Sequence, residues 1–436
     1  MILNYYPEFN SKDFTEENIF KAVFKKEKYD YFKIKNIISD IYQLSELFLK
    51  TISTLNISFE NDIVLLNALH ERDLDSVYLK REKQLDVKMK NSLRDESYFY
   101  SKYLLAKINT SHFKFEKTGY QFGQIQNEFD AFLDYSLTGL LRLYSKMLHN
   151  KNHGNVNFNM EMFENVLEYI KDKDFEDNPS NKIYKTIILL ELSKDEKYYR
   201  ELLSLKEKFE SVISNEDMYY ILLIINSFSV YKLKLGDESY YRDRFLSFKE
   251  IIDRKFIPDN YFLFVNFIST FTSACMAGEI EWAENFLADH QKGISPKEET
   301  FNTVNYCKGF LEYRKRNYDC ALEYFAKTNF KLFLVKVMVK SYSIRIFYEQ
   351  DMYEQTISAI DTFRHYLKSE NQISEDLKTA QYEFLRFLSE LTRLKIDNIK
   401  NNNDPRLIVL RKEIENMSSN PLGAKNWLIE KANNFI

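Results

Sequence analysis

Glycine and proline are unusually scarce in this sequence, with nine glycines and six prolines among 436 residues. An average protein uses roughly 7% glycine and about 5% proline. Folds with many β-strands need tight hairpin turns, which depend heavily on these two residues. The scarcity therefore excludes a many-stranded fold and favours long helices joined by short connections.

Cysteine is scarcer still, because the chain has only three, at positions 275, 307 and 320. Three cysteines so widely scattered exclude a disulfide framework and a zinc cage. We interpret them as small hydrophobic residues of a protein that works in a reducing compartment.

Catalytic and ligand-binding motifs are missing as well. The sequence contains no GxxxxGK[ST], GxGxxG or GxSxG pattern, so we expect no phosphate-binding loop and no serine nucleophile elbow. His149 and His153 are four residues apart, but they lack the intervening glutamate of a zinc-protease motif. We therefore expect a protein that is not an enzyme and that needs no cofactor or metal.

Long hydrophobic runs are also absent, since no apolar stretch approaches the ~20 residues that a membrane-spanning helix needs. The N-terminal stretch MILNYYPEFNSKDF has neither the basic nor the apolar region of a signal peptide. The net charge of −4 gives the whole chain no attraction to nucleic acid or to an anionic membrane. The sequence thus predicts a cytoplasmic protein that does not bind membranes.

The sequence does contain enough apolar material for a real core. Hydrophobic residues make up 44% of the chain and charged residues 29%, a balance typical of folded proteins. The 36 phenylalanines and 31 tyrosines fall mostly at helical spacing. This placement favours packing between helices over the alternative, in which aromatic rings stack on bases or sugars.

Residues 1–92 are predicted to form an N-terminal helical unit. Thr15 precedes two glutamates and an apolar run, so it fits the N-cap of a first helix. A second helix is predicted from about 32 to 55, with one apolar stripe, and a helical pair covers 59–92. Residues 93–180 are predicted to be connecting helices.

A basic stretch lies at residues 78–94 of this region. Its positive side chains are Lys80, Arg81, Lys83, Lys88, Lys90 and Arg94. Glu82 and Asp86 lie among them, which favours an ordinary solvated helix face with some ion pairing. The alternative is a surface that contacts the phosphates of nucleic acid or an acidic partner.

Five segments in the second half of the chain share one pattern: an apolar helix ends, a short polar turn follows, and a second helix begins. The turns fall at Asp195, Asp237, Gly278, Arg316 and Asp351, which are 42, 41, 38 and 35 residues apart. Neither helix of such a unit can bury its apolar stripe alone, so neighbouring units must stack. The spacing predicts an all-α fold with an α-solenoid at 181–370.

One of these segments, residues 302–328, resembles a tetratricopeptide repeat. Gly309 and Ala321 stand at the two small positions where the paired helices cross, and Phe325 stands at the position of the aromatic that fills the groove between them. Asn305 and Lys308 replace the tryptophan and leucine of the family, and its closing proline is absent. The other segments match less closely, so residues 181–370 resemble a degenerate series of such repeats.

The resemblance implies a right-handed α-solenoid of antiparallel helix pairs whose first helices line a concave groove. Proteins of that family bind peptides or partner proteins in this groove. The groove positions carry over to Asn305, Lys308, Lys340 and Ser341. The whole layout is also similar to an uncharacterised bacterial family of repeat-type helical proteins.

Residues 371–436 are predicted to be C-terminal capping helices. Ser374 fits the cap of one helix, and Asp404 with Pro405 fits the start of another after the break at Asn401–Asn403. The apolar tail around Trp427 is expected to seal the end of the repeats, or alternatively to dock on a partner.

These observations predict a non-catalytic helical-repeat scaffold that binds a protein or peptide partner in its groove. The alternative is a regulatory protein that contacts nucleic acid through its N-terminal helices and the basic face at 78–94.

Overall fold

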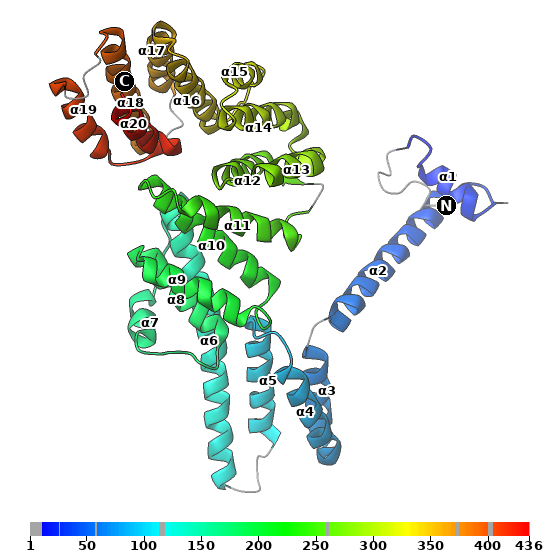
Figure 1. Cartoon of the computed structure of the whole chain (residues 1–436). Helices are drawn as coiled ribbons and strands as arrows, with labels where there is room; N and C mark the ends of the chain where they lie inside the picture. Colours follow the sequence, from blue (N-terminus) through cyan, green and yellow to red (C-terminus); the bar gives the residue numbers. More distant parts are fainter. Residues whose placement is uncertain are drawn as a thin grey trace. The chain divides into compact units, whose positions relative to one another are not determined.

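The computed structural model describes residues 11–25, 27–56, 59–112, 118–154, 156–258, 261–370, 375–399 and 404–435. These residues are almost entirely helical, which confirms the all-α fold class (Figure 1). The chain divides into two compact units, Met1–Leu140 and Leu141–Ile436. The boundary falls inside the segment at 93–180 that the sequence predicts as connecting helices.

The first unit contains five helices and most of a sixth. They are α1 (Glu16–Val23), α2 (Tyr31–Asn56), α3 (Glu60–His70), α4 (Asp75–Lys90), α5 (Glu96–His112) and α6 (Thr118–Gly154), which continues into the second unit. The predicted cap at Thr15 is confirmed, because its side chain accepts a hydrogen bond from the Asn18 amide at 3.3 Å. Tyr78 and Leu85 of α4 are buried in a cluster with side chains of α3 and α5. Along α2, Ile34 is buried, whereas Ile41 and other members of the apolar stripe are exposed.

The second unit continues with α7 (Phe163–Ile170) and then five helix pairs. The pairs are α8 (Pro179–Ser193) with α9 (Glu196–Phe209), α10 (Asn215–Lys234) with α11 (Tyr240–Asp253), α12 (Phe264–Met276) with α13 (Ile280–His290), α14 (Thr300–Arg314) with α15 (Tyr318–Ala326), and α16 (Phe333–Glu349) with α17 (Tyr353–Ser369). Two short strands, β1 (Phe262–Leu263) and β2 (Ile294–Ser295), form a parallel pair beside α12. Members of each pair contact each other, and α9 contacts α10, α11 contacts α12, and α14 contacts α16.

The short turn inside each pair contains one residue with left-handed backbone geometry. These residues are Lys194, Gly236, Gly278, Arg316 and Asp351. At the third turn, the Gly278 amide donates to the Cys275 carbonyl and the Glu279 amide donates to the Ala274 carbonyl. The turns at Gly236, Arg316 and Asp351 repeat this hydrogen-bond pattern, which closes the last turn of a helix. Four of the five pairs are thus joined by the same local structure.

Two of the turns lie one residue earlier than the sequence places them. Asp195 and Asp237 follow the left-handed residues instead of occupying that position. Asp195 is the N-cap of α9 and accepts a hydrogen bond from the Lys197 amide at 2.9 Å. Asp195 therefore starts α9, a role that its short acceptor side chain favours. Asp237 lies two residues before the N-cap of α11, Ser239, and accepts a hydrogen bond from the Ser239 amide at 3.2 Å.

Arg316 provides a test of this turn, because a side chain at a φ of 62° is strained and glycine is not. We expect Arg316→Gly to stabilise the protein by about 0.5–1 kcal/mol, measured by urea unfolding. Arg314→Gly, at the last residue of α14, should instead destabilise by up to about 1 kcal/mol. Equal losses in both variants would show that the turn carries no such strain.

Helices α14 and α15 approach each other most closely at Gly309. A Cβ atom there would lie 2.8 Å from the Phe325 ring and 3.2 Å from the Ala321 carbonyl oxygen. Ala321 is 0% exposed and Phe325 is 3% exposed. These are the residues at which the sequence places the helix crossing.

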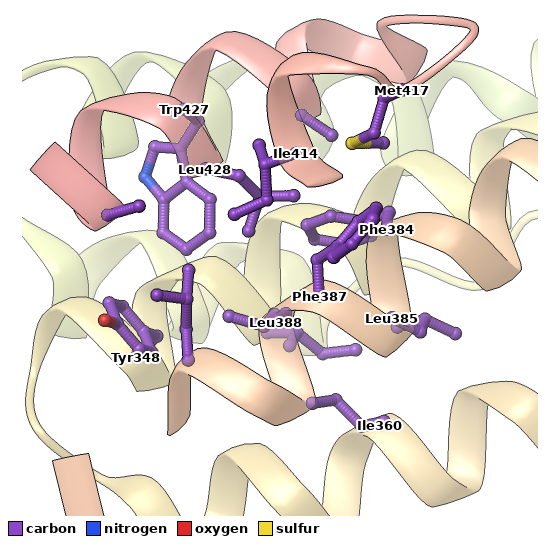
Figure 2. Packing of buried hydrophobic residues seen from close by; sticks show 14 of the residues in the cluster. Tyr348, Ile360, Phe384, Leu385, Phe387, Leu388, Ile414, Met417, Trp427 and Leu428 are labelled. Atoms are coloured by element: carbon purple, nitrogen blue, oxygen red, sulfur yellow. The ribbon is translucent and has the colours of Figure 1, made fainter. Parts of the chain in front are cut away.

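The chain ends in three helices, α18 (Glu375–Ile396), α19 (Pro405–Glu415) and α20 (Ala424–Asn433), with a short 3-10 turn, η4 (Pro421–Gly423), before the last. Figure 2 shows Trp427 and Leu428 of α20 facing Phe384 and Leu388 of α18, so the apolar tail is buried in the protein's own core. The Asp404 cap is confirmed by its bond to the Arg406 amide at 2.9 Å. Ser374 and Asn401–Asn403 lie outside the described residues.

Candidate functional site

Two of the four partner-binding residues suggested by the sequence are buried. Asn305 is 8% exposed, and its side-chain amide donates to the Phe301 carbonyl of its own helix at 2.8 Å. Ser341 is 1% exposed, because this side of α16 is covered by α18. Its hydroxyl donates to Gln381 Oε1 of α18 at 3.3 Å. This corrects the assignment of Asn305 and Ser341 to an exposed groove.

The other two residues, Lys308 and Lys340, occupy equivalent places on neighbouring helix pairs. The ammonium nitrogen of Lys308 on α14 lies 5.9 Å from the ring centre of Tyr324 on α15. That of Lys340 on α16 lies 5.0 Å from the ring centre of Tyr366 on α17. Each lysine thus reaches from the first helix of a pair to a tyrosine on the second, an arrangement that stabilises the cation.

Lys340 is the more enclosed of the two lysines. Burial lowers its pKa, and the nearby positive charge of Lys336 lowers the pKa further. Among the described residues neither Lys336 nor Lys340 has an acidic side chain in ion-pair contact. A partner carboxylate at this point would relieve the repulsion between the two ammonium groups.

Lys340 also lines an open groove of about 440 Å³ between α16 and α17. The lining residues are Val339, Lys340, Ser343, Ile344 and Phe347 of α16, and Gln355, Ser358, Ala359, Thr362 and Phe363 of α17. Half of them are apolar, four carry hydroxyl or amide groups, and Lys340 is the one charged member. An apolar surface with a few polar groups and one cation suits an amphipathic segment that carries acidic residues.

The sequence interpretation did not identify this groove, although part of its signal was present. Val339, Ser343 and Phe347 recur every fourth residue, so they share one face of α16. A hydroxyl residue in the middle of that stripe indicates a face that is not fully buried. The residues of α17 that line the groove show no comparable sequence pattern. They lie beside α16 only because of the angle at which the two helices pack.

The predicted basic face lies mainly on α4, and Lys80, Arg81, Lys83, Lys88 and Lys90 are exposed there, with Arg94 half-buried just after the helix. Two of these charges are compensated. Lys88 pairs with Asp62 of α3 at 2.8 Å, and Lys90 pairs with Asp86 at 2.7 Å. The pairing reduces the positive charge available for phosphate contacts.

A second cavity, of about 530 Å³, lies between α18 and α19. Leu394, Val409 and Leu410 contribute apolar surface to it. Most of its charged groups are already ion-paired. Arg406 pairs with Asp397 at 3.2 Å, and Glu390 and Glu413 pair with Arg386 at 3.4 and 2.8 Å. The α18–α19 cavity is therefore lined mainly by charges that already have partners, whereas the one charge of the α16–α17 groove has no acidic partner among the described residues.

The cysteine and histidine side chains do not assemble a reactive site in the described part of the chain. Burial raises the pKa of Cys275 to about 12 and that of Cys307 also well above its usual range, while Cys320 is exposed. His149 Nδ1 lies 2.9 Å from Glu191 Oε1, and the side chain of His153 lies outside the described residues. Within the described ranges, no three His, Cys, Asp or Glu side chains are grouped to hold a metal ion.

None of the helices described here combines the length and the apolar character required to cross a membrane. No protein-family model, curated protein or solved structure matches the chain. Its function is therefore inferred from the chemistry of its own surfaces.

Proposed function

We propose that the chain is a non-catalytic helical-repeat scaffold that binds a protein or peptide partner. The repeats would be the five helix pairs at 179–369, arranged as a right-handed α-solenoid of antiparallel pairs. Five successive helix pairs, each joined by a short turn with one left-handed residue, support a repeated unit. Scaffolds of this kind bind through surfaces shared by neighbouring helices and need no catalytic loop.

The α16–α17 groove is the binding surface of this proposal. The observation that carries it is a groove with an apolar floor, an uncharged polar rim and one enclosed lysine, Lys340. The partner we propose is an amphipathic segment with apolar anchors for Phe347 and Phe363 and with aspartate or glutamate beside Lys340. The nucleic-acid alternative has less support, because Lys88 and Lys90 of the basic face are ion-paired.

Cross-linking from the groove tests the proposal. A photoreactive amino acid replaces Ser358, an exposed residue at the rim of the groove, and forms a covalent cross-link to the bound segment on illumination. Mass spectrometry then identifies the sequence of the cross-linked segment. Captured segments are expected to combine apolar residues with aspartate or glutamate. Synthetic peptides copied from them would supply the dissociation constant by fluorescence anisotropy.

Reversal of the groove charge is expected to weaken this binding. Lys340→Glu should raise the dissociation constant of such a peptide at least about tenfold, because a partly desolvated attraction becomes a repulsion. Lys331→Glu is the matched control, since Lys331 is exposed and does not line the groove. Equal binding to both variants, or captured segments without acidic residues, would refute the proposal.

A further inference from the structure

The segment Asn420–Trp427 binds to the end of α10, although the two lie almost half the chain apart in sequence. The Asn420 amide donates to the Lys234 carbonyl at 2.7 Å, and its side-chain Nδ2 donates to the Leu233 carbonyl at 3.2 Å. The side-chain Nδ2 of Asn426 donates to the Gly236 carbonyl at 2.8 Å. Carbonyl groups at the end of a helix lack amide donors within that helix, so they attract such side-chain and backbone donors.

Arg345 of α16 holds the same segment from another side. Its guanidinium donates to the Leu422 carbonyl at 3.0 Å, with a longer contact of 3.5 Å to the Pro421 carbonyl. The side chain is 3% exposed, and its Nε has no hydrogen-bond partner in the described structure. Three aromatic rings surround the guanidinium within 6 Å: those of Tyr342, Phe384 and Trp427.

The backbone of the segment is shaped to fit these contacts. Leu422 and Gly423 both have left-handed geometry, with φ of 53° and 70°, so Asn-Pro-Leu-Gly forms a compact turn. The ideal Cβ position at Gly423 lies 3.6 Å from Glu238 Oε1 and 3.8 Å from the Tyr241 hydroxyl. The turn therefore rests against the start of α11 while its carbonyls face Arg345.

Backbone groups and two asparagine side chains supply most of these contacts. This is the way a folded domain recognises a short peptide, with main-chain bonds for affinity and a few side chains for specificity. Asn420 is 4% exposed, so its bonds form in a site from which water is largely excluded. The contacts involve Arg345 and Tyr342 of α16, which do not line the α16–α17 groove.

We infer that the end of α10, the start of α11 and Arg345 form a peptide-binding site that the chain's own Asn420–Trp427 segment occupies as an internal ligand. The site takes an Asn-Pro-Leu-Gly turn followed by a second asparagine. When the segment withdraws, the site becomes available to the same turn on another molecule. This inference does not depend on the proposed role of the α16–α17 groove.

Hydrogen exchange of the full chain gives the first test. In the double variant Asn420→Ala/Asn426→Ala, we expect amides at 233–241 and 420–427 to exchange at least about tenfold faster, while α14 and α15 keep their protection. Asn416→Ala is the control, because this exposed asparagine lies four residues before Asn420. Unchanged protection at 233–241 in the double variant would overturn the inference. If the double variant does not fold, Asn426→Ala alone removes the bond to Gly236.

Binding of the segment in trans gives the second test. A synthetic peptide of residues 417–427, MSSNPLGAKNW, should bind the double variant at least about tenfold more tightly than the wild-type chain, whose site is filled. The same peptide with both asparagines replaced by alanine should bind neither. Absence of peptide binding to an opened variant would show that the segment is a fixed part of the fold and not an internal ligand.

Discussion

Gly309→Leu is expected to destabilise the protein by about 3 kcal/mol or more, because α14 and α15 leave no room for a side chain at their crossing. Even the first added carbon would lie 2.8 Å from two atoms of the Phe325 ring and 3.2 Å from the Ala321 carbonyl oxygen. Real Cβ atoms do not approach other atoms as closely as 2.8 Å, so the ring or the helix must shift.

The Phe325 ring has little freedom to make such a shift. It is 3% exposed and packs against Tyr306 and Tyr342, with ring centres 5.9 and 6.5 Å away. A displaced ring would disturb contacts to α14 and to α16 of the next pair. The substitution should therefore loosen two helix pairs, and urea unfolding followed by circular dichroism would measure the loss.

Gly309→Ala provides a graded version of the same experiment, with an expected loss of about 1–3 kcal/mol. Gly139→Ala is its control, since Gly139 also lies inside a helix but its nearest contact would be an ordinary 3.6 Å to Glu96 Oε1. The control should gain up to about 1 kcal/mol from the better helix propensity of alanine.

A double-mutant cycle locates the clash. Phe325→Leu should cost less in the Gly309→Ala background than in the wild type, because the smaller side chain makes room for the new methyl group. Additive losses would place the strain elsewhere, and a stabilised Gly309→Ala variant would contradict the close crossing itself.

The crossing and three of the five turns were predictable to the residue, because they depend on residues that are close in sequence. Small residues at Gly309 and Ala321, a capping threonine at Thr15 and the Asp404–Pro405 start each determine geometry within one helix or between two successive helices. Local preference and tertiary contacts agree at these positions, so the sequence alone is sufficient.

The sequence did not predict which side of a first helix stays exposed. Asn305 and Ser341 occupy positions that line a groove in the resembling family, yet here both are buried. Ser341 is covered by α18, a helix from a later part of the chain, through Gln381. The orientation of a helix within its own pair does not determine what the following helices cover.

Long-range polar contacts were unpredictable for a related reason. Lys88 appears in the sequence as part of a basic run, but its partner Asp62 comes from the preceding helix. The bond between Asn420 and Leu233 joins residues almost half the chain apart. Such contacts depend on how the helix pairs stack, which no local pattern specifies.

Glu191 is expected to make the protein sensitive to acid through a buried network that the sequence did not reveal. Its side chain on α8 is 3% exposed. His149 Nδ1 of α6 lies 2.9 Å from one carboxylate oxygen, Asn152 Nδ2 donates to the other at 2.8 Å, and the Lys194 ammonium also contacts the latter. Burial alone would raise the pKa of this carboxyl, but the bonds from His149, Lys194 and Asn152 outweigh it and lower the pKa to about 2.

The lowered pKa of Glu191 determines how the stability of the protein changes with pH. In the unfolded chain the Glu191 carboxyl returns to its ordinary pKa of 4.5, so the unfolded state binds the proton more readily than the folded state. The stabilisation is fully present above about pH 4.5 and is lost as the pH falls towards 2. From the difference between the two pKa values, the loss amounts to about 3 kcal/mol.

Glu191→Gln should remove this stabilisation at pH 7, with a loss of about 3 kcal/mol, and should flatten the decline of stability between pH 4.5 and 2. Glu196→Gln is the matched control. The pKa of Glu196 is also lowered to about 2 by its bonds to Lys232 and Arg200, but its side chain is 42% exposed and solvent screens its charge. Urea unfolding at pH 7 and pH 3, in low and high salt, separates the two sites. The stability lost in Glu191→Gln should be the same in low and high salt, because the carboxylate is buried. If the stability of Glu191→Gln falls between pH 7 and pH 3 as much as that of the wild type, Glu191 is not the source of the acid sensitivity.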